Sequence, residues 1–321
     1  YTPPLVLLDD PDHRRIRLLM SKAFNPQSIE AMRGRIETIT RELLDACHGR
    51  DRIDLIADFA GPLPTQAILE MMGMPTARRD DFKRWSEEIL MGYDPDRDAE
   101  TQARLRDAYI EMGREFQRVV DARREAPRDD LISAMVRAQE DADRLTDLEI
   151  ISLCTQLIVA GNVTTTDLIG NGVLALIENP GEFARLRADP GLVDNAVEEM
   201  LRYDCPITET ARIPIHDDML NGCPVQAGTT LTASLAAANH DPEVFPEPHR
   251  FDIARDATAH LAFGSGIHVC LGAPLARLEG QNAIRELVAR WPRLGLDPEQ
   301  PPRRRALPFF RGLTCLPLRT A

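Results

Sequence analysis

A glycine-rich stretch around one cysteine constrains this chain more than any other feature of its sequence. Residues 263–277 read FGSGIHVCLGAPLAR, with Gly264, Gly266 and Gly272 close to Cys270 and a helical pattern following. Glycine is needed where the backbone adopts a positive φ or approaches a ligand closely. At the start of a helix, free N–H groups and the helix dipole stabilise a thiolate. The segment therefore predicts a thiolate that serves as an axial ligand for iron.

The other five cysteines offer no competing explanation. Cys47, Cys154, Cys205, Cys223 and Cys315 are scattered, and the chain contains neither a CxxC pair nor CxxCH. This spacing argues against a disulfide scaffold, a zinc cluster and a covalently attached c-type haem. An ordinary buried cysteine beside a flexible loop is the alternative, but it does not account for the pattern of Phe, Gly and His before the cysteine.

Most of the chain is predicted to be helical. Apolar residues recur at helical spacing in five segments, residues 28–47, 62–72, 80–90, 102–124 and 129–139. A capping-box sequence, TDLE at residues 146–149, begins a long segment that ends before Pro180. Because that segment is apolar almost all round, we expect a buried central helix.

Only short pieces of the chain have the character of strands. They are residues 210–215, 223–225, 229–233 and 313–318. No repeat, low-complexity tract or linker divides the 321 residues. The predicted fold class is therefore mainly α with small β-sheets, in a single domain over residues 1–321.

Charge and composition exclude several functions. Lys plus Arg is 38 and Asp plus Glu is 51, so the net charge is −13, whereas nucleic-acid binding requires a basic surface. With 43% hydrophobic and 28% charged residues, the chain is of the globular type. Its apolar runs are shorter than the ~20 residues of a membrane span, and no signal-peptide pattern is visible. We predict a cytoplasmic protein that binds neither nucleic acid nor membrane.

The cysteine segment resembles the haem-thiolate signature of the cytochrome P-450 (P450) superfamily. FGSGIHVCLG carries the resemblance, and the APLARLE that follows is similar to the bacterial soluble branch. The resemblance implies the cytochrome P450 fold, a helical domain around a buried haem b, with Cys270 as the proximal iron ligand. Phe263 would pack beneath the porphyrin and His268 would contact a propionate. The other haem-binding residues it implies in this turn are Gly264, Gly272 and Ala276.

Four further residues would hold the two haem propionates. His13 and Arg17 are four apart in DHRRIR, and by themselves they read as a solvated basic face. By the resemblance both reach propionates, which suits the charge and the forked geometry of arginine. Arg212 in TETARIP and His260 in HLAFG resemble the remaining propionate contacts.

A second motif of the family lies outside the haem site. Glu199 and Arg202 are three apart in EEMLR, and alone they predict a surface ion pair worth roughly 0.2–0.5 kcal/mol. They resemble the family's Glu-x-x-Arg, whose third partner would be Arg250 in FPEPHRF. We therefore predict a buried structural charge network.

Residues 157–166, LIVAGNVTTT, resemble the oxygen-binding groove of the family. Gly161 would leave room for dioxygen, and the Thr164 hydroxyl can bond back to the carbonyl of Ala160. Without the cysteine signature, the same residues read as ordinary buried helix.

One residue of this groove departs from the family. Val163 stands where members usually carry Asp or Glu, which helps to deliver protons. Because valine cannot exchange a proton, we expect delivery to be slowed or rerouted through Thr164, ordered water, and Asn162 or Asp167.

The substrate side is predicted to be mostly apolar. By the resemblance it combines the groove with residues 206–209 and 307–310, which favours a hydrophobic small molecule. Glu209 could bind a substrate amine, although an outward salt bridge is the more ordinary role. The predicted substrate contacts are Leu157, Ile207, Thr208, Glu209, Phe309 and Phe310.

Together these residues predict a haem-thiolate monooxygenase that inserts one oxygen atom of dioxygen into a C–H bond. NAD(P)H would supply electrons indirectly, through ferredoxin reductase and a ferredoxin that docks near Arg14, Arg15 and Arg277. One alternative, which Val163 motivates, is a peroxide-driven or non-hydroxylating enzyme that catalyses coupling or dehydration. Another is a non-catalytic haem-binding protein, against which Thr164 stands. We expect a monomer.

The resemblance extends from DDPDHRR near the start to FFRGLTCLPL near the end. Members of the family usually carry further helices, part of a β-sheet and a substrate-contacting loop before the His13 helix. Roughly a fifth of the expected length is therefore absent from this chain.

Overall fold

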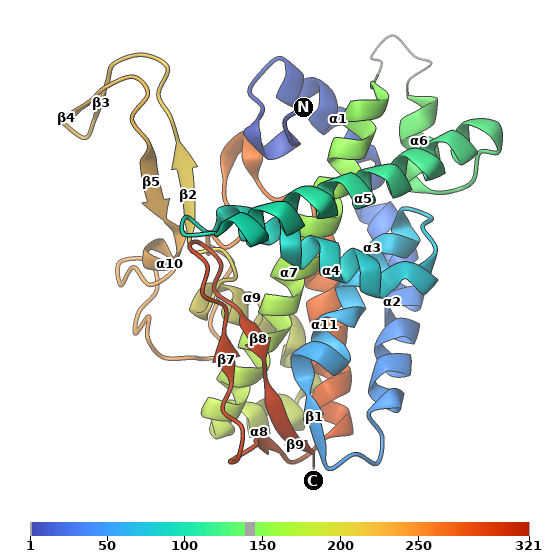
Figure 1. Ribbon diagram of the computed structural model, residues 1–321. Helices are drawn as coiled ribbons and strands as arrows, with labels where there is room; N and C mark the ends of the chain where they lie inside the picture. The colour runs from blue at the N-terminus through green and yellow to red at the C-terminus, as the bar shows by residue number, and fades with distance from the viewer. Residues whose placement is uncertain (1, 139–144, 321) are drawn as a thin grey trace.

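The computed structural model describes residues 2–138 and 145–320 (Figure 1). It is built mainly of helices. They are α1 (Asp12–Ala23), α2 (Pro26–Ala46), α3 (Pro62–Met71), α4 (Arg79–Leu90), α5 (Ala99–Glu125), α6 (Leu131–Arg137), α7 (Asp147–Glu178), α8 (Pro180–Ala188), α9 (Val193–Tyr203), α10 (Leu235–Ala238) and α11 (Ala273–Arg290). The predicted mainly α fold is therefore confirmed.

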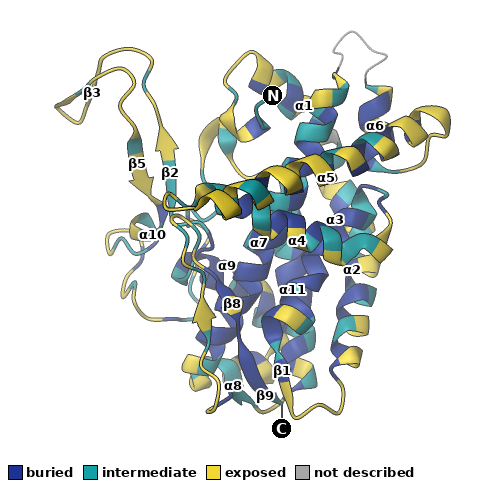
Figure 2. Ribbon diagram, viewed as in Figure 1, coloured by how far each residue is buried: buried dark blue, intermediate teal, exposed yellow. Residues whose placement is uncertain are grey.

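The long helix α7 forms the centre of the molecule, as its apolar sequence predicts (Figures 1 and 2). It begins with the predicted capping box, in which the Glu149 N–H donates to Thr146 Oγ1 and the Thr146 N–H donates to Glu149 Oε2. Helices α3, α4, α5, α9 and α11 pack around it. Gly172 lets α9 come close, because a β-carbon there would lie 2.5 Å from the sulfur of Met200.

Among the helices of the described residues, α7 alone is long and apolar enough to cross a membrane. A core helix of a soluble protein has the same length and composition. The helices packed around α7 explain its apolar character without a bilayer.

The strands are short and lie at the margins of the helical body. They are β1 (Arg52–Asp54), β2 (Glu209–Arg212), β3 (Asp218–Leu220), β4 (Cys223–Val225), β5 (Leu231–Ser234), β6 (Leu294–Leu296), β7 (Arg303–Arg304), β8 (Leu313–Cys315) and β9 (Pro317–Thr320). One sheet has the order β1-β9-β6, and the pairs β2–β5, β3–β4 and β7–β8 stand apart. All the pairings are antiparallel.

The sequence predicts helices better than strands here. Side-chain caps place the ends of α2, α5 and α6, where Asn25, Asp98 and Asp130 accept backbone N–H groups. The predicted segment 129–139 is a shorter helix in the structure, and its last residue lies outside the described residues. Strands β1, β3, β6 and β7 were not predicted. Each has two or three residues, too few for alternation to show.

Candidate functional site: a cysteine turn before helix α11

Cys270 lies in a tight turn immediately before α11. Its N–H donates to the Phe263 carbonyl at 2.9 Å, which closes the turn. Gly264 and Gly266 have φ angles of 68° and 71°, a region that side chains disfavour. The glycine pattern of the sequence is thus explained by the backbone path that presents the cysteine.

The environment of the Cys270 sulfur suits a metal-binding thiolate. The residue is open to solvent, yet protein atoms crowd its sulfur, and this desolvation raises the pKa of the thiol. The backbone N–H groups of Gly272 and Ala273 and the charge of Arg17 act in the opposite direction and stabilise the anion. The six cysteines lie within the described residues, and all are free thiols.

His13 and His268 come together although they are far apart in the sequence. Their ring centroids are 4.4 Å apart. His13 is 3% exposed, and its Nε2 has no hydrogen-bond partner among the described residues. A buried polar atom rarely remains unsatisfied. We therefore expect a bound group to supply the hydrogen-bond acceptor that the described residues do not give to this nitrogen.

Arg17 and Arg212 belong to the same cluster. Desolvation lowers the pKa of His268, and the positive charges of His13, Arg212 and Arg17 lower it further. Such a collection of cations and ring nitrogens beside a thiol fits a haem, whose iron binds sulfur and whose two propionates bind cations. The residues present therefore fit the predicted cofactor.

The structure gives His260 other contacts than the propionate that was predicted for it. Its Nε2 lies 3.1 Å from Glu198 Oε2, and its Nδ1 accepts the Ala262 N–H at 3.1 Å. Because both ring nitrogens are engaged within the protein, the geometry argues against His260 as a propionate contact. Its position in HLAFG did not reveal this partner, which comes from a distant helix.

Two of the arginines predicted to attract an electron carrier are already paired. Arg277 donates to both oxygens of Glu198, and its guanidinium lies 4.6 Å from the centre of the Phe263 ring. Arg15 forms an ion pair with Glu149 at 2.5 Å. Their charges are largely neutralised, so the predicted attraction is weaker than the sequence suggests.

The oxygen-side residues adopt the predicted geometry in part. Thr164 Oγ1 donates to the Ala160 carbonyl at 2.6 Å. A β-carbon added at Gly161 would have a side-chain carbon of Ile68 as its nearest neighbour, at 3.9 Å, so the helix has free space there. Ala160, Gly161 and Thr164 thus provide a small, polar stretch of α7.

Asn162 faces away from this stretch. Its side-chain amide lies 2.8 Å from Thr65 Oγ1 of α3, and its backbone carbonyl accepts the Thr166 hydroxyl at 2.9 Å. The residue is 2% exposed. These contacts join α7 to α3, and they argue against the predicted catalytic role of Asn162.

The predicted substrate residues from two distant segments meet. Ile207 forms a β-bridge with Phe310, and the Thr208 N–H donates to the Phe309 carbonyl at 2.9 Å. Phe309 has a φ of 68° and is 42% exposed. Glu209 lies in β2 opposite Ser234. Leu157 is partly buried against the core.

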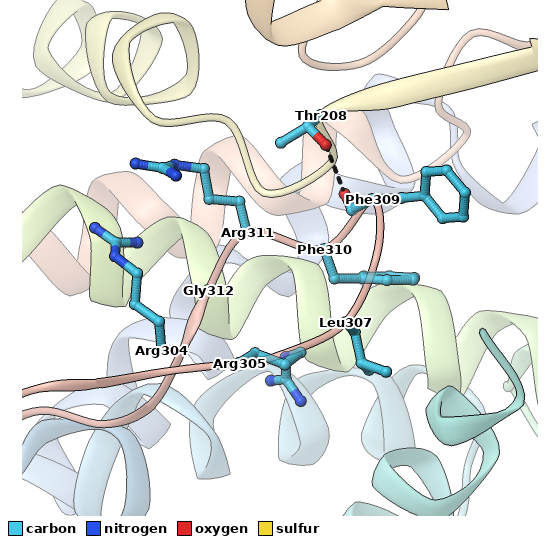
Figure 3. Close-up of a pocket in the computed structure, with 8 residues that line it drawn as sticks. All are labelled: Thr208, Arg304, Arg305, Leu307, Phe309, Phe310, Arg311 and Gly312. Carbon is cyan, nitrogen blue, oxygen red and sulfur yellow. Dashed lines mark hydrogen bonds between the residues drawn. The ribbon is translucent and has the colours of Figure 1, made fainter. Parts of the chain in front are cut away.

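A pocket of about 270 Å³ lies beside these residues (Figure 3). Its apolar and hydroxyl-bearing part was predicted, but its charged part was not. The residues that line it are Thr208, Arg304, Arg305, Leu307, Phe309, Phe310, Arg311 and Gly312. The sequence signal for the charged part was the run of arginines at 303–305, which only the hairpin of β7 and β8 brings to the pocket.

The predicted charge network exists with a different third member. Glu199 and Arg202 are fully buried and joined by hydrogen bonds of 2.6 and 2.8 Å. The second arginine that pairs with Glu199 is Arg255 and not Arg250, and its Nε lies 3.3 Å from Glu199 Oε1. Arg250 contributes its backbone carbonyl, while its side chain is exposed and faces Glu247. The prediction of Arg250 was wrong because its side chain pairs with Glu247 and Asp252 instead of Glu199.

Comparison with known proteins identifies the family of this chain. Residues 65–311 match the cytochrome P450 family. Cytochrome P450 107B1 of Saccharopolyspora erythraea is 43% identical over 320 residues, covering 99% of this chain and 77% of the relative. The 6-deoxyerythronolide B hydroxylase of the same organism is 42% identical, covering 97% and 76%. The solved structure of P450BioI with a fatty-acid-ligated acyl carrier protein has a TM-score of 0.94 at 36% identity, covering 99% and 81%.

The Cys270 turn and the paired histidines have the chemistry that a haem requires, and the relatives include named hydroxylases. Haem is therefore the cofactor, and small molecules and redox partners serve the family in general. The chain belongs to the cytochrome P450 family and is a haem-thiolate monooxygenase.

Proposed function

We propose that the protein inserts one oxygen atom of dioxygen into a C–H bond of a hydrophobic small molecule. The observation that carries this proposal is the Cys270 turn beside the buried, unsatisfied Nε2 of His13. Haem bound there would supply the oxygen chemistry. Cys270 would bind its iron, and His13, Arg17, Arg212 and His268 would hold its propionates.

Residues of the chain itself manage the substrate and the oxygen side. Gly161 leaves space on α7, and the Thr164 hydroxyl, bonded to Ala160, can hold and exchange a proton. Phe309 and Phe310 present aromatic surface, and Thr208 offers one hydroxyl beside them. The apolar side of the pocket favours a lipophilic substrate, and the arginines of the same pocket favour one that also carries an anionic or oxygen-bearing group.

The relatives suggest where to begin the search for that substrate. One is named for hydroxylation of 6-deoxyerythronolide B, another for polyketide biosynthesis, and a solved relative holds a fatty acid on its carrier protein. We therefore place a polyketide-derived molecule first, with fatty acids and steroids as comparisons. Spin-state shifts on titration of the three classes would rank them.

Electrons come from NAD(P)H through ferredoxin reductase and ferredoxin, and the carrier docks on the Cys270 face. Arg14 is exposed on α1 beside this face, and Ile267 of the turn is 56% exposed. An exposed cation and an apolar side chain near the iron ligand suit an acidic carrier. The protein would work in the cytoplasm as a monomer.

The decisive experiment is the carbon-monoxide difference spectrum of the reduced protein. A long-wavelength thiolate band is expected for the wild type and should be absent from Cys270→Ser. Cys223→Ser is the matched control, since Cys223 is also exposed but lies in β4. A wild-type spectrum without the thiolate band would contradict the assignment of Cys270.

A second candidate, peroxide-driven or non-hydroxylating chemistry, is favoured by one observation. Val163 is 2% exposed and occupies the position of the family's acidic residue. Turnover with added hydrogen peroxide, but not with dioxygen and reduced ferredoxin, would favour this candidate over oxygen insertion.

A further inference from the structure

We propose that Asp167 relays protons, through water, between the Thr164 side of α7 and the arginine-lined pocket of Figure 3, and that Arg305 stays protonated and orients the Asp167 carboxylate. This inference rests on the proposed oxygen insertion, which consumes protons. It assigns to Asp167 the proton exchange that Val163 cannot perform. Asp167 acts through Thr164 and is therefore a positioning and relay residue, not one that touches substrate.

The helical spacing places Asp167 on the same face as Thr164. Thr164, Asp167 and Asn171 follow one another at intervals of three and four along α7. Toward the C-terminal end of α7, this face contacts the segment between β7 and β8, where the Asn171 side chain donates to the Arg311 carbonyl at 2.7 Å. The face thus leads from the oxygen side toward the pocket.

Because Gly312 has no side chain, it leaves the space that the Asp167 carboxylate occupies. A β-carbon at Gly312 would overlap that carboxylate, so only glycine permits this position. Gly312 also lines the pocket. The carboxylate consequently lies directly behind the pocket wall, although Asp167 itself is fully buried.

The pair is held loosely enough to exchange partners. Arg305 Nη2 lies 3.5 Å from Asp167 Oδ1, the limit of a hydrogen bond. Asp167 Oδ2 and Arg305 Nε are both buried and have no partner among the described residues. A fully structural buried ion pair has its remaining atoms satisfied. Two free hydrogen-bonding atoms, one on each member, are instead what a relay through water needs.

The surrounding charges suit proton exchange near neutral pH. Burial raises the pKa of Asp167 to about 7, and Asp204 raises it too, while Arg305 and Arg304 lower it. Asp204 is itself paired with Arg304 and Arg311, both exposed at the pocket. A carboxyl with such a pKa passes between its two protonation states at physiological pH.

Glu279 of α11 is the competing candidate. Burial raises the pKa of this carboxyl to about 8, and Thr165 hydrogen-bonds to it. It is 2% exposed, does not line the pocket, and has no ion pair among the described residues. Its Oε1 also has no hydrogen-bond partner among the described residues, but Glu279 is neither beside the pocket nor paired with an arginine there, so it serves as the matched control.

The test compares Asp167→Asn with Glu279→Gln in the haem-loaded protein. We expect Asp167→Asn to lower the yield of product per electron by about tenfold, with the electrons appearing as hydrogen peroxide. The wild-type yield should change with a midpoint near pH 7, and this pH dependence should vanish in Asp167→Asn. Glu279→Gln should keep both the yield and the pH profile. Arg305→Gln should resemble Asp167→Asn, and it provides a second variant should the first not fold.

A readout without turnover accompanies these assays. In the resting protein, an infrared band of a protonated carboxyl should titrate near pH 7 and be absent from Asp167→Asn. This infrared band remains measurable even if the protein does not insert oxygen. A failure of the proposed relay can therefore be distinguished from a failure of the proposed function. Adding Val163→Asp to Asp167→Asn should restore the product yield. A wild-type yield and pH profile in Asp167→Asn, or their loss in Glu279→Gln alone, would overturn the proposal.

Discussion

Arg277 and Glu198 form a bidentate ion pair, with nitrogen–oxygen distances of 2.7 and 2.9 Å, that joins α11 to α9. Glu198 also holds His260, in the loop before the Cys270 turn. One carboxylate therefore fixes the segments on both sides of Cys270. The position of Cys270 therefore depends on this carboxylate, and the positive charge of Arg277 also acts to lower the pKa of the Cys270 thiol.

Glu198→Gln should make the protein less sensitive to acid. Burial alone would raise the pKa of Glu198, but His260 and Arg277 hold it at about 2, below its ordinary 4.5. A depressed pKa contributes stability that is complete above pH 4.5 and is lost as the pH falls toward 2. Urea unfolding at several pH values should show that the free energy of unfolding falls more steeply between pH 4.5 and pH 2 in the wild type than in Glu198→Gln. Equal slopes in both proteins would refute the role of Glu198.

The charge network gives a prediction that separates Arg255 from Arg250. Arg255→Ala should reduce the free energy of unfolding by roughly 1–3 kcal/mol, because it removes a donor from the fully buried Glu199. Arg250→Ala should stay within about 0.5 kcal/mol, since only its backbone takes part. Denaturant unfolding of the two variants measures the difference. The reverse order would restore Arg250 as the third member.

The sequence predicted those parts of the site that depend on local spacing. The turn around Cys270, the bond from Thr164 to Ala160 and the capping box at Thr146 each involve residues within a few positions of one another. Local geometry is set by φ angles and helical period, so a pattern of residue types is enough to foresee it.

Features that depend on long-range packing were not predictable in the same way. His260 was predicted to contact a propionate and Asn162 to take part in proton delivery, but each turns toward a partner on another helix. Buried polar side chains take whichever partner the packing supplies, and nothing within a local motif reveals that choice. The pocket arginines were not predicted for the same reason, because a hairpin brings them beside Asp167.

His13 and His260 give opposite predictions for haem retention. His13→Leu should release haem faster, because the variant removes the buried nitrogen that has no partner among the described residues. His260→Gln should retain haem like the wild type while losing stability, since it weakens the contact to Glu198. Transfer of haem to an excess of an apo-globin measures the release rate. Faster loss from His260→Gln than from His13→Leu would show that the propionate assignment is wrong.

Gly161→Ala should separate the stability of α7 from access to the oxygen side. A methyl group there meets only Ile68 at 3.9 Å, so replacing glycine within a helix should stabilise the protein by about 0.5–1 kcal/mol. The same methyl occupies the space left for dioxygen, and it should slow the binding of carbon monoxide to the reduced protein. Gly172→Ala is the contrasting variant, because its methyl would collide with Met200. It should destabilise the fold without a specific effect on gas binding. Flash photolysis and thermal unfolding together decide the point, and unchanged gas binding in Gly161→Ala would remove Gly161 from the oxygen side.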